Sequence, residues 1–158
     1  MQVLAGLALS AGLDGRKGLD WTSTSSGYRR PYPRAVKAAT WDELLATHDT
    51  DVQAAARVLE TLIREELPDV IVEFDPGNAL LAFGRSMKMR DLLFALIPHA
   101  RWVNLQLADG ALLPNPDDLI EGTGKRIRHV KVRSASAAAD SKIRAIVWAQ
   151  IALGAPGS

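Results

Sequence analysis

The sequence contains no cysteine. That absence excludes disulfide bonds, thiolate nucleophiles, zinc ribbons and cysteine-ligated clusters. Histidine is also scarce: His48, His99 and His129 are the only three, and they show no paired-ligand spacing. A dedicated transition-metal site is therefore not predicted, because such sites need several closely spaced nitrogen or sulfur ligands.

Long hydrophobic runs are missing as well. No apolar stretch approaches the ~18 residues that a membrane-spanning helix needs, so we expect no membrane partner. Residues 1–12 have an apolar centre but lack the positively charged leading residues of a signal peptide. We therefore expect a cytoplasmic protein with no cleaved leader.

Two familiar catalytic motifs are absent. The stretch "EGTGK" is no phosphate-binding loop, because Leu119 stands where the first glycine belongs and Arg126 follows the lysine in place of Ser or Thr. Ser86 lies in "GRSMK", which is no nucleophile elbow. The pairing of Glu73 or Asp75 with His99 or His129, as in a small hydrolase, stays open because only geometry could establish it.

What is present is an ordinary globular composition with an unusual charge distribution. The 158 residues, 47% of them hydrophobic, suit one domain with its own core. The net charge is only +1, yet residues 41–75 carry ten acids against two arginines, and residues 125–144 carry seven bases against one aspartate. The two regions either neutralise each other as neighbours or form separate electrostatic patches.

Two helices are predicted after an irregular N-terminal segment. Thr40 or Asp42 caps a short helix through "WDELLATH", and a long amphipathic helix follows through "TDVQAAARVLETLIREELPD". Thr50 and Gln53 form a capping box at its start, and Pro68 ends it. Its apolar stripe consists of Val52, Ala55, Leu59, Leu62, Ile63 and Leu67.

Two β-hairpins are predicted next, because the apolar period changes to two. "VIVEFDPGNALLAFGR" turns at residues 75–78, which are all turn-forming types. "DLLFALIPHARWVNLQLADG" turns near His99 and Ala100. In its second half the apolar residues alternate with Trp102, Asn104 and Gln106, so these three point to one face.

The remaining elements are a short helix, a strand and a long helix. Asn115 and Gly122 mark the ends of the short helix "PNPDDLIEG"; "KRIRHVKVRS" is the fifth strand, and "SASAAADSKIRAIVWAQIAL" is one long helix. The order predicts an α+β fold with a five-stranded, mainly antiparallel sheet and helices on one face. We divide the chain into an arm (1–39), a domain (40–153) and a tail (154–158).

The basic stretch "EGTGKRIRHVKVRS" is the most unusual feature. Alternation puts Ile127 and Val130 on opposite sides, which predicts a bulge or a strand that enters the core only in its second half. We interpret the stretch as an anion pocket, with donors for a phosphate or carboxylate. The alternative is an edge strand protected by charge. The predicted ligand-binding residues are Lys125, Arg126, Arg128, His129, Lys131 and Trp102.

The order of elements and the segment "LIEGTGKRIRHVKVRS" resemble the YdhG-like family, catalogued as domain of unknown function 1801. "FALIPHARWVNLQLADGALLPNP" is similar to the family's central hairpin, and the resemblance covers about residues 45–153. One branch of that family is proposed to act as frataxin-like iron chaperones. The resemblance therefore implies an iron-binding alternative in which Glu65, Glu66 and Asp69 hold the metal, with Glu73 or Asp75 beside them.

The sequence thus favours a non-catalytic YdhG-like binding protein with a small anionic or polar ligand. An iron chaperone is the second hypothesis and a small hydrolase the third. A nucleic-acid partner is a less favoured alternative, suggested by the arm "GYRRPYPR", in which tyrosines alternate with arginines.

Overall fold

The computed structural model describes residues 38–154. Residues 1–37 of the predicted arm and residues 155–158 of the predicted tail lie outside the described part of the chain. The centre of the fold is a five-stranded sheet in which sequence neighbours pair and every pair is antiparallel. The strands are β1 (Ile71–Asp75), β2 (Leu80–Gly84), β3 (Leu92–Pro98), β4 (Val103–Leu107) and β5 (Arg128–Val132).

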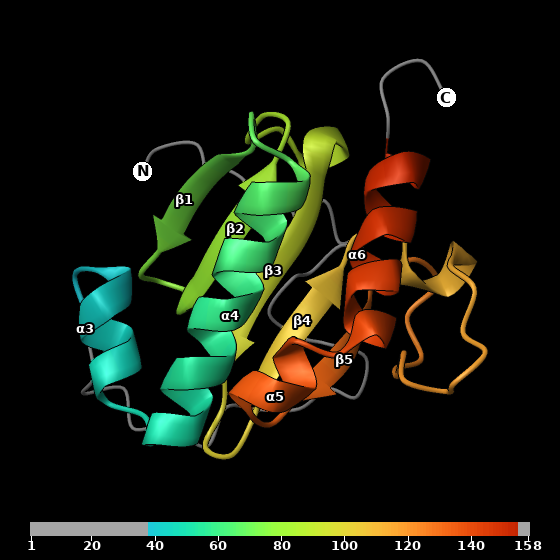
Figure 1. Ribbon diagram of the computed structural model, residues 1–158. Helices are drawn as coiled ribbons and strands as arrows, with labels where there is room; N and C mark the ends of the chain where they lie inside the picture. Colours follow the sequence, from blue (N-terminus) through green and yellow to red (C-terminus); the bar gives the residue numbers. More distant parts are fainter. Residues whose placement is uncertain (1–37, 155–158) are drawn as a thin grey trace.

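The α-helices of the described residues all pack against one face of this sheet (Figure 1). This arrangement confirms the predicted α+β class. The main core lies between the two layers, and a smaller apolar cluster that includes Ala82, Ala95 and Ile97 lies on the other face. The helices are α3 (Trp41–Ala46), α4 (Thr50–Glu66), α5 (Ala135–Ala138) and α6 (Ser141–Leu153), with 3-10 turns η2 (Met89–Asp91) and η3 (Gly110–Leu112).

Helix α4 has the predicted stripe but a different cap. Its apolar residues from Val52 to Ile63 are buried against the sheet. The N-cap is Asp49, whose carboxylate accepts a hydrogen bond of 3.1 Å from the Val52 N–H. Thr50 is already helical, so the predicted capping box is wrong. Gln53 instead donates to the His48 carbonyl at 2.8 Å.

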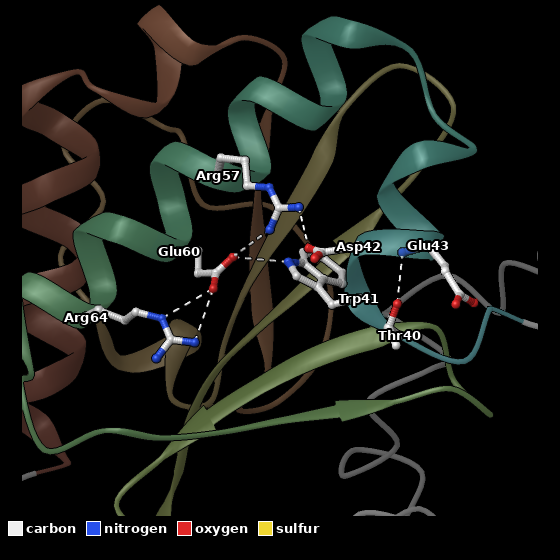
Figure 2. Close-up of polar contacts among 7 residues, drawn as sticks. All are labelled: Thr40, Trp41, Asp42, Glu43, Arg57, Glu60 and Arg64. Atoms are coloured by element: carbon white, nitrogen blue, oxygen red, sulfur yellow. Dashed lines mark hydrogen bonds and ion pairs between the residues drawn. The ribbon is translucent and has the colours of Figure 1, made fainter.

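Helix α3 is fastened to α4 by a polar cluster (Figure 2). The Trp41 ring is buried, and its Nε1 donates to Glu60 Oε1 at 3.1 Å. Arg57 reaches from α4 to Asp42 of α3 and also contacts Glu60 at 3.4 Å, while Arg64 pairs with Glu60 at 3.1 Å. One carboxylate therefore joins two arginines and an indole, and this cluster fixes the short helix in place.

Both predicted hairpins are confirmed. Strands β1 and β2 are joined at the predicted turn, where Asp75 accepts from the Asn78 backbone N–H at 3.1 Å and from its side chain at 2.7 Å. Strands β3 and β4 pair from Pro98 opposite Val103 onwards, so their turn lies at residues 99–102. The hydrogen bonds from Asn78 to the Asp75 side chain are of the Asx-turn type, which explains why Asp and Asn favour the β1–β2 turn.

The predicted helix at residues 115–122 is wrong. The Asn115 side chain donates to the Ile120 carbonyl and accepts from its N–H, both at 3.0 Å, and so closes a loop. The Asp118 backbone has a φ of 57°, which is incompatible with a right-handed helix. A side chain that can cap a helix can equally form hydrogen bonds with the backbone of a turn, and the Asn115 side chain does the latter.

The predicted C-terminal helix is divided into α5 and α6. Ser134 caps α5 by accepting from the Ala137 N–H at 3.1 Å. Asp140 caps α6 by accepting from the Lys142 N–H at 2.8 Å. A second capping residue thus interrupts the single helix that was expected. Ile143, Ile146, Val147 and Gln150 form the buried side of α6.

Candidate functional site

Strand β5 is an edge strand of the sheet, next to β4 only. Its pairing with β4 is continuous from Arg128 opposite Leu107 to Val132 opposite Val103, without a bulge. Val130 and Val132 join the main core on the helix side, so His129 and Lys131 point to the other face. The strand therefore enters the core only in its second half, as one of the two predicted alternatives states.

Arg126 lies just before β5 and is held by a buried carboxylate. Its guanidinium forms an ion pair with Asp109, two residues after the end of β4. Asp109 also accepts a hydrogen bond of 3.0 Å from the side-chain amide of Gln150, and its own N–H donates to Gln150 Oε1 at 2.8 Å. Arg126 thus belongs to a network that ties α6 to the end of the sheet.

The other predicted bases do not converge on one pocket. Arg128 points to the helix side and donates from Nε to the Gly124 carbonyl at 2.9 Å. Lys131 points to the opposite face, where its Nζ lies 3.6 Å from Glu121 Oε1. Lys125 is exposed in the preceding loop. A single anion could not contact Arg128 and Lys131 together, because the sheet lies between them.

His129 is buried on the same face as Lys131. Its backbone pairs with Glu121 through hydrogen bonds of 2.7 and 3.0 Å, which cover the outer edge of β5 at this point. Burial lowers the pKa of the imidazole, the Glu121 carboxylate raises it and the Lys131 ammonium lowers it. The neutral ring is therefore favoured, and His129 contributes little positive charge near neutral pH.

A compact group of side chains gathers around Trp102, where β4 begins. The His99 ring stacks on the indole with centroids 5.1 Å apart and planes 20° apart. The indole Nε1 donates to Asn104 Oδ1 at 2.8 Å. Lys131 Nζ lies 4.9 Å and the Arg133 guanidinium carbon 5.6 Å from the ring centre. We call these five residues the Trp102 cluster.

The sheet register brings the Trp102 cluster together. Pro98 pairs with Val103, and Val103 pairs with Val132, so the β3–β4 turn lies beside the end of β5. The prediction included Trp102 and Lys131 but missed Arg133 as a site residue. The available signal was the spacing of two, which places Lys131 and Arg133 on the same side of an extended chain.

The residues predicted to hold iron are not gathered into a site. The Glu66 carboxylate accepts from the Arg144 guanidinium and from the Trp148 indole N–H. Glu65 and Asp69 are exposed. Within residues 38–154, no three His, Asp or Glu side chains form a group that could hold a metal ion.

One of the predicted hydrolase pairs is clearly separated. Glu73 lies on β1 and His129 on β5, at opposite edges of the sheet, which is about 19 Å at the usual strand spacing. The Asp75 carboxylate accepts hydrogen bonds from Asn78 in the β1–β2 turn. His99 stacks on Trp102. The Glu73–His129 pair is therefore too far apart to act as a general acid–base pair.

Comparison of the chain with known protein families, with curated proteins and with solved structures finds no significant match. The YdhG-like resemblance stays a prediction. No helix between residues 38 and 154 has the length and apolar character to cross a membrane.

Proposed function

We propose that this chain is a binding protein of the YdhG-like kind that holds a small anion at the Trp102 cluster. The observation that carries the proposal is that two cations, Lys131 and Arg133, lie over one indole ring, at 4.9 and 5.6 Å from its centre. Both cations are placed around the same ring, so a phosphate or carboxylate bound beside it would be attracted by two positive charges.

The other members of the cluster would keep the cations in position. Trp102 is fixed by stacking on His99 and by its hydrogen bond to Asn104. A ring held on two sides is a rigid support, and cation–π attraction keeps both bases above it. Arg133 is exposed, so its guanidinium is accessible for bidentate contact with an oxyanion.

Glu121 sets the strength of this site. Its carboxylate lies 3.6 Å from Lys131 Nζ and half exposed, so the pair is weak in water. An incoming anion would compete with Glu121 for the ammonium. We therefore expect the affinity of the site for the anion to be modest, and Glu121→Gln should increase that affinity.

Inorganic phosphate tests the proposal by thermal unfolding and calorimetric titration of the whole chain. A ligand at one hundred times its dissociation constant stabilises the folded state by about 2.7 kcal/mol. Arg133→Ala and Lys131→Ala should remove most of this protection, and high salt should reduce it in the original chain. Lys125→Ala is the matched control, because it removes an exposed base of the same segment.

Two outcomes would contradict the proposal. Equal loss of protection in Lys125→Ala and Arg133→Ala would mean that charge alone attracts the anion. If Lys131→Ala and Arg133→Ala left the phosphate response unchanged but made the protein self-associate, the bases would serve to protect an edge strand.

A further inference from the structure

The connection between β4 and β5 is long and almost without regular structure. It runs over residues 108–127 and contains only the short turn η3. Connections of this length in a compact domain are usually functional. Its two ends are joined by the Asp109–Arg126 ion pair and by a hydrogen bond of 2.9 Å from the Ala111 N–H to the Arg126 carbonyl.

The middle of this connection stands beside α6, on the side away from α4 (Figure 1). A cavity of about 340 Å³ separates them, at the lower end of the range for small-molecule sites. Alanines at positions 145 and 149 leave this flank of α6 open. The apolar part of the lining consists of Pro114, Pro116, Leu119, Ala145, Ile146 and Ala149.

The polar part of the lining includes one acid and one base. Lys142 Nζ of α6 lies 3.7 Å from Asp117 Oδ1 of the loop, and both side chains are about half exposed. A pair this long and this exposed contributes little to stability. The Asn115–Ile120 hydrogen bonds hold the loop in shape, so opening this ion pair would not collapse the cavity.

We propose that this cavity binds a small zwitterion with an apolar side chain, such as a hydrophobic α-amino acid. The ligand carboxylate would pair with Lys142 and its ammonium group with Asp117, replacing the weak pair between them. The apolar side chain would lie against Leu119, Ile146 and Ala149. A ligand with only one charge would form only one of these two ion pairs, so it would bind more weakly than the zwitterion.

L-Leucine is the probe, and the full chain is titrated by calorimetry. Two analogues of the same shape each lack one charge: 3-methylbutylamine has no carboxylate and 4-methylpentanoate has no amine. We expect leucine to bind with a Kd of about 1 mM or below and each analogue up to about fivefold more weakly, the ratio that one exposed charge pair supports. Equal binding of leucine and either analogue would overturn the zwitterion assignment.

Variants locate the site. Lys142→Ala and Asp117→Ala should each weaken leucine binding up to about fivefold, and Ala149→Phe should abolish it by filling the cavity. Lys88→Ala removes an exposed lysine elsewhere and should have no effect. Should Ala149→Phe fail to fold, the two charge variants decide. Unchanged leucine affinity in both, or no leucine binding to the original chain, would refute the proposal.

This inference is independent of the phosphate site. Arg133→Ala should leave leucine binding unchanged, and Lys142→Ala should leave phosphate protection unchanged. Loss of both ligands in either single variant would show that the two sites are not separate.

Discussion

Helix α4 and strand β5 are both rich in charge, yet the fold uses that charge differently. On α4 the helical period separates apolar from charged positions, so Glu60 can contact Arg57 and Arg64 on one side of the helix (Figure 2). On β5 the period of two sends Arg128 to the helix side and Lys131 to the opposite face. Charged residues three or four positions apart can therefore form ion pairs on α4, whereas charged residues an odd number of positions apart on β5 lie on opposite faces of the sheet.

The same comparison explains the uneven charge along the chain. Among the described residues, one ion pair links the acidic region 41–75 with the basic region 125–144, and it joins Glu66 to Arg144. Other bases of the second region pair with acids of the β4–β5 connection, as Lys131 does with Glu121. The two regions therefore act mainly as separate surfaces rather than as partners.

The largest expected effect comes from the apolar side of α4. Leu59 is fully buried between the helix and the sheet. Leu59→Ala should lower the free energy of unfolding by about 3 kcal/mol, because the lost side chain leaves a cavity. Urea unfolding measures this, with Arg64→Ala as the control on the exposed side, where we expect about 0.5 kcal/mol or less. Similar losses in both variants would mean that charge pairing matters as much as the core.

The comparison of α4 with β5 also shows which features of the fold could be predicted from the sequence. The stripe of α4 and the two hairpins were predicted correctly, because periodicity and turn residues are local signals. The cap of α4 was assigned to Thr50 instead of Asp49, since adjacent residues of similar capping ability cannot be ranked without backbone angles. The prediction of a helix at residues 115–122 was wrong because the Asn115 side chain is hydrogen-bonded to the Ile120 backbone. This contact competes with helix capping.

The candidate site was less accessible to prediction than the fold. Its members come from the β3–β4 turn, from β4 and from the end of β5, and these segments become neighbours only through the register of two strand pairs. Lys125 and Arg126 were included because they adjoin Arg128 in sequence, although Arg126 is engaged by Asp109. Proximity in sequence selected the bases in and around β5, and proximity in space brings Lys131 and Arg133 together at the Trp102 ring.

A smaller effect should appear at the start of α4. Asp49→Ala removes the side chain that accepts from the Val52 N–H, and it should cost about 1 kcal/mol, as the loss of an N-cap usually does. Thr50→Ala is the control and should change stability by a few tenths of a kcal/mol at most. Thermal unfolding compares the two. A larger loss in Thr50→Ala would restore the predicted capping box.

The smallest expected effect is a dependence of folding stability on pH, which tests the environment of His129 on β5. Burial lowers the pKa of His129 below its ordinary value of about 6.5. The unfolded chain therefore takes up a proton first as the pH falls. Stability should be complete above about pH 6.5 and should decrease as the pH drops below it. The effect is small because the Glu121 carboxylate offsets part of the burial, while Lys131 adds to it.

Denaturant unfolding between pH 7.5 and 5 measures this dependence, and the difference between the original chain and His129→Gln isolates it from the other titrating groups. Glu121→Gln should steepen the decrease, because it removes the group that favours the protonated ring. Parallel curves for the original chain and His129→Gln would show that folding leaves the pKa of His129 unchanged. In that case His129 would carry a positive charge below about pH 6.5, and the proposed anion site would extend at that pH from Arg133 through Lys131 to His129.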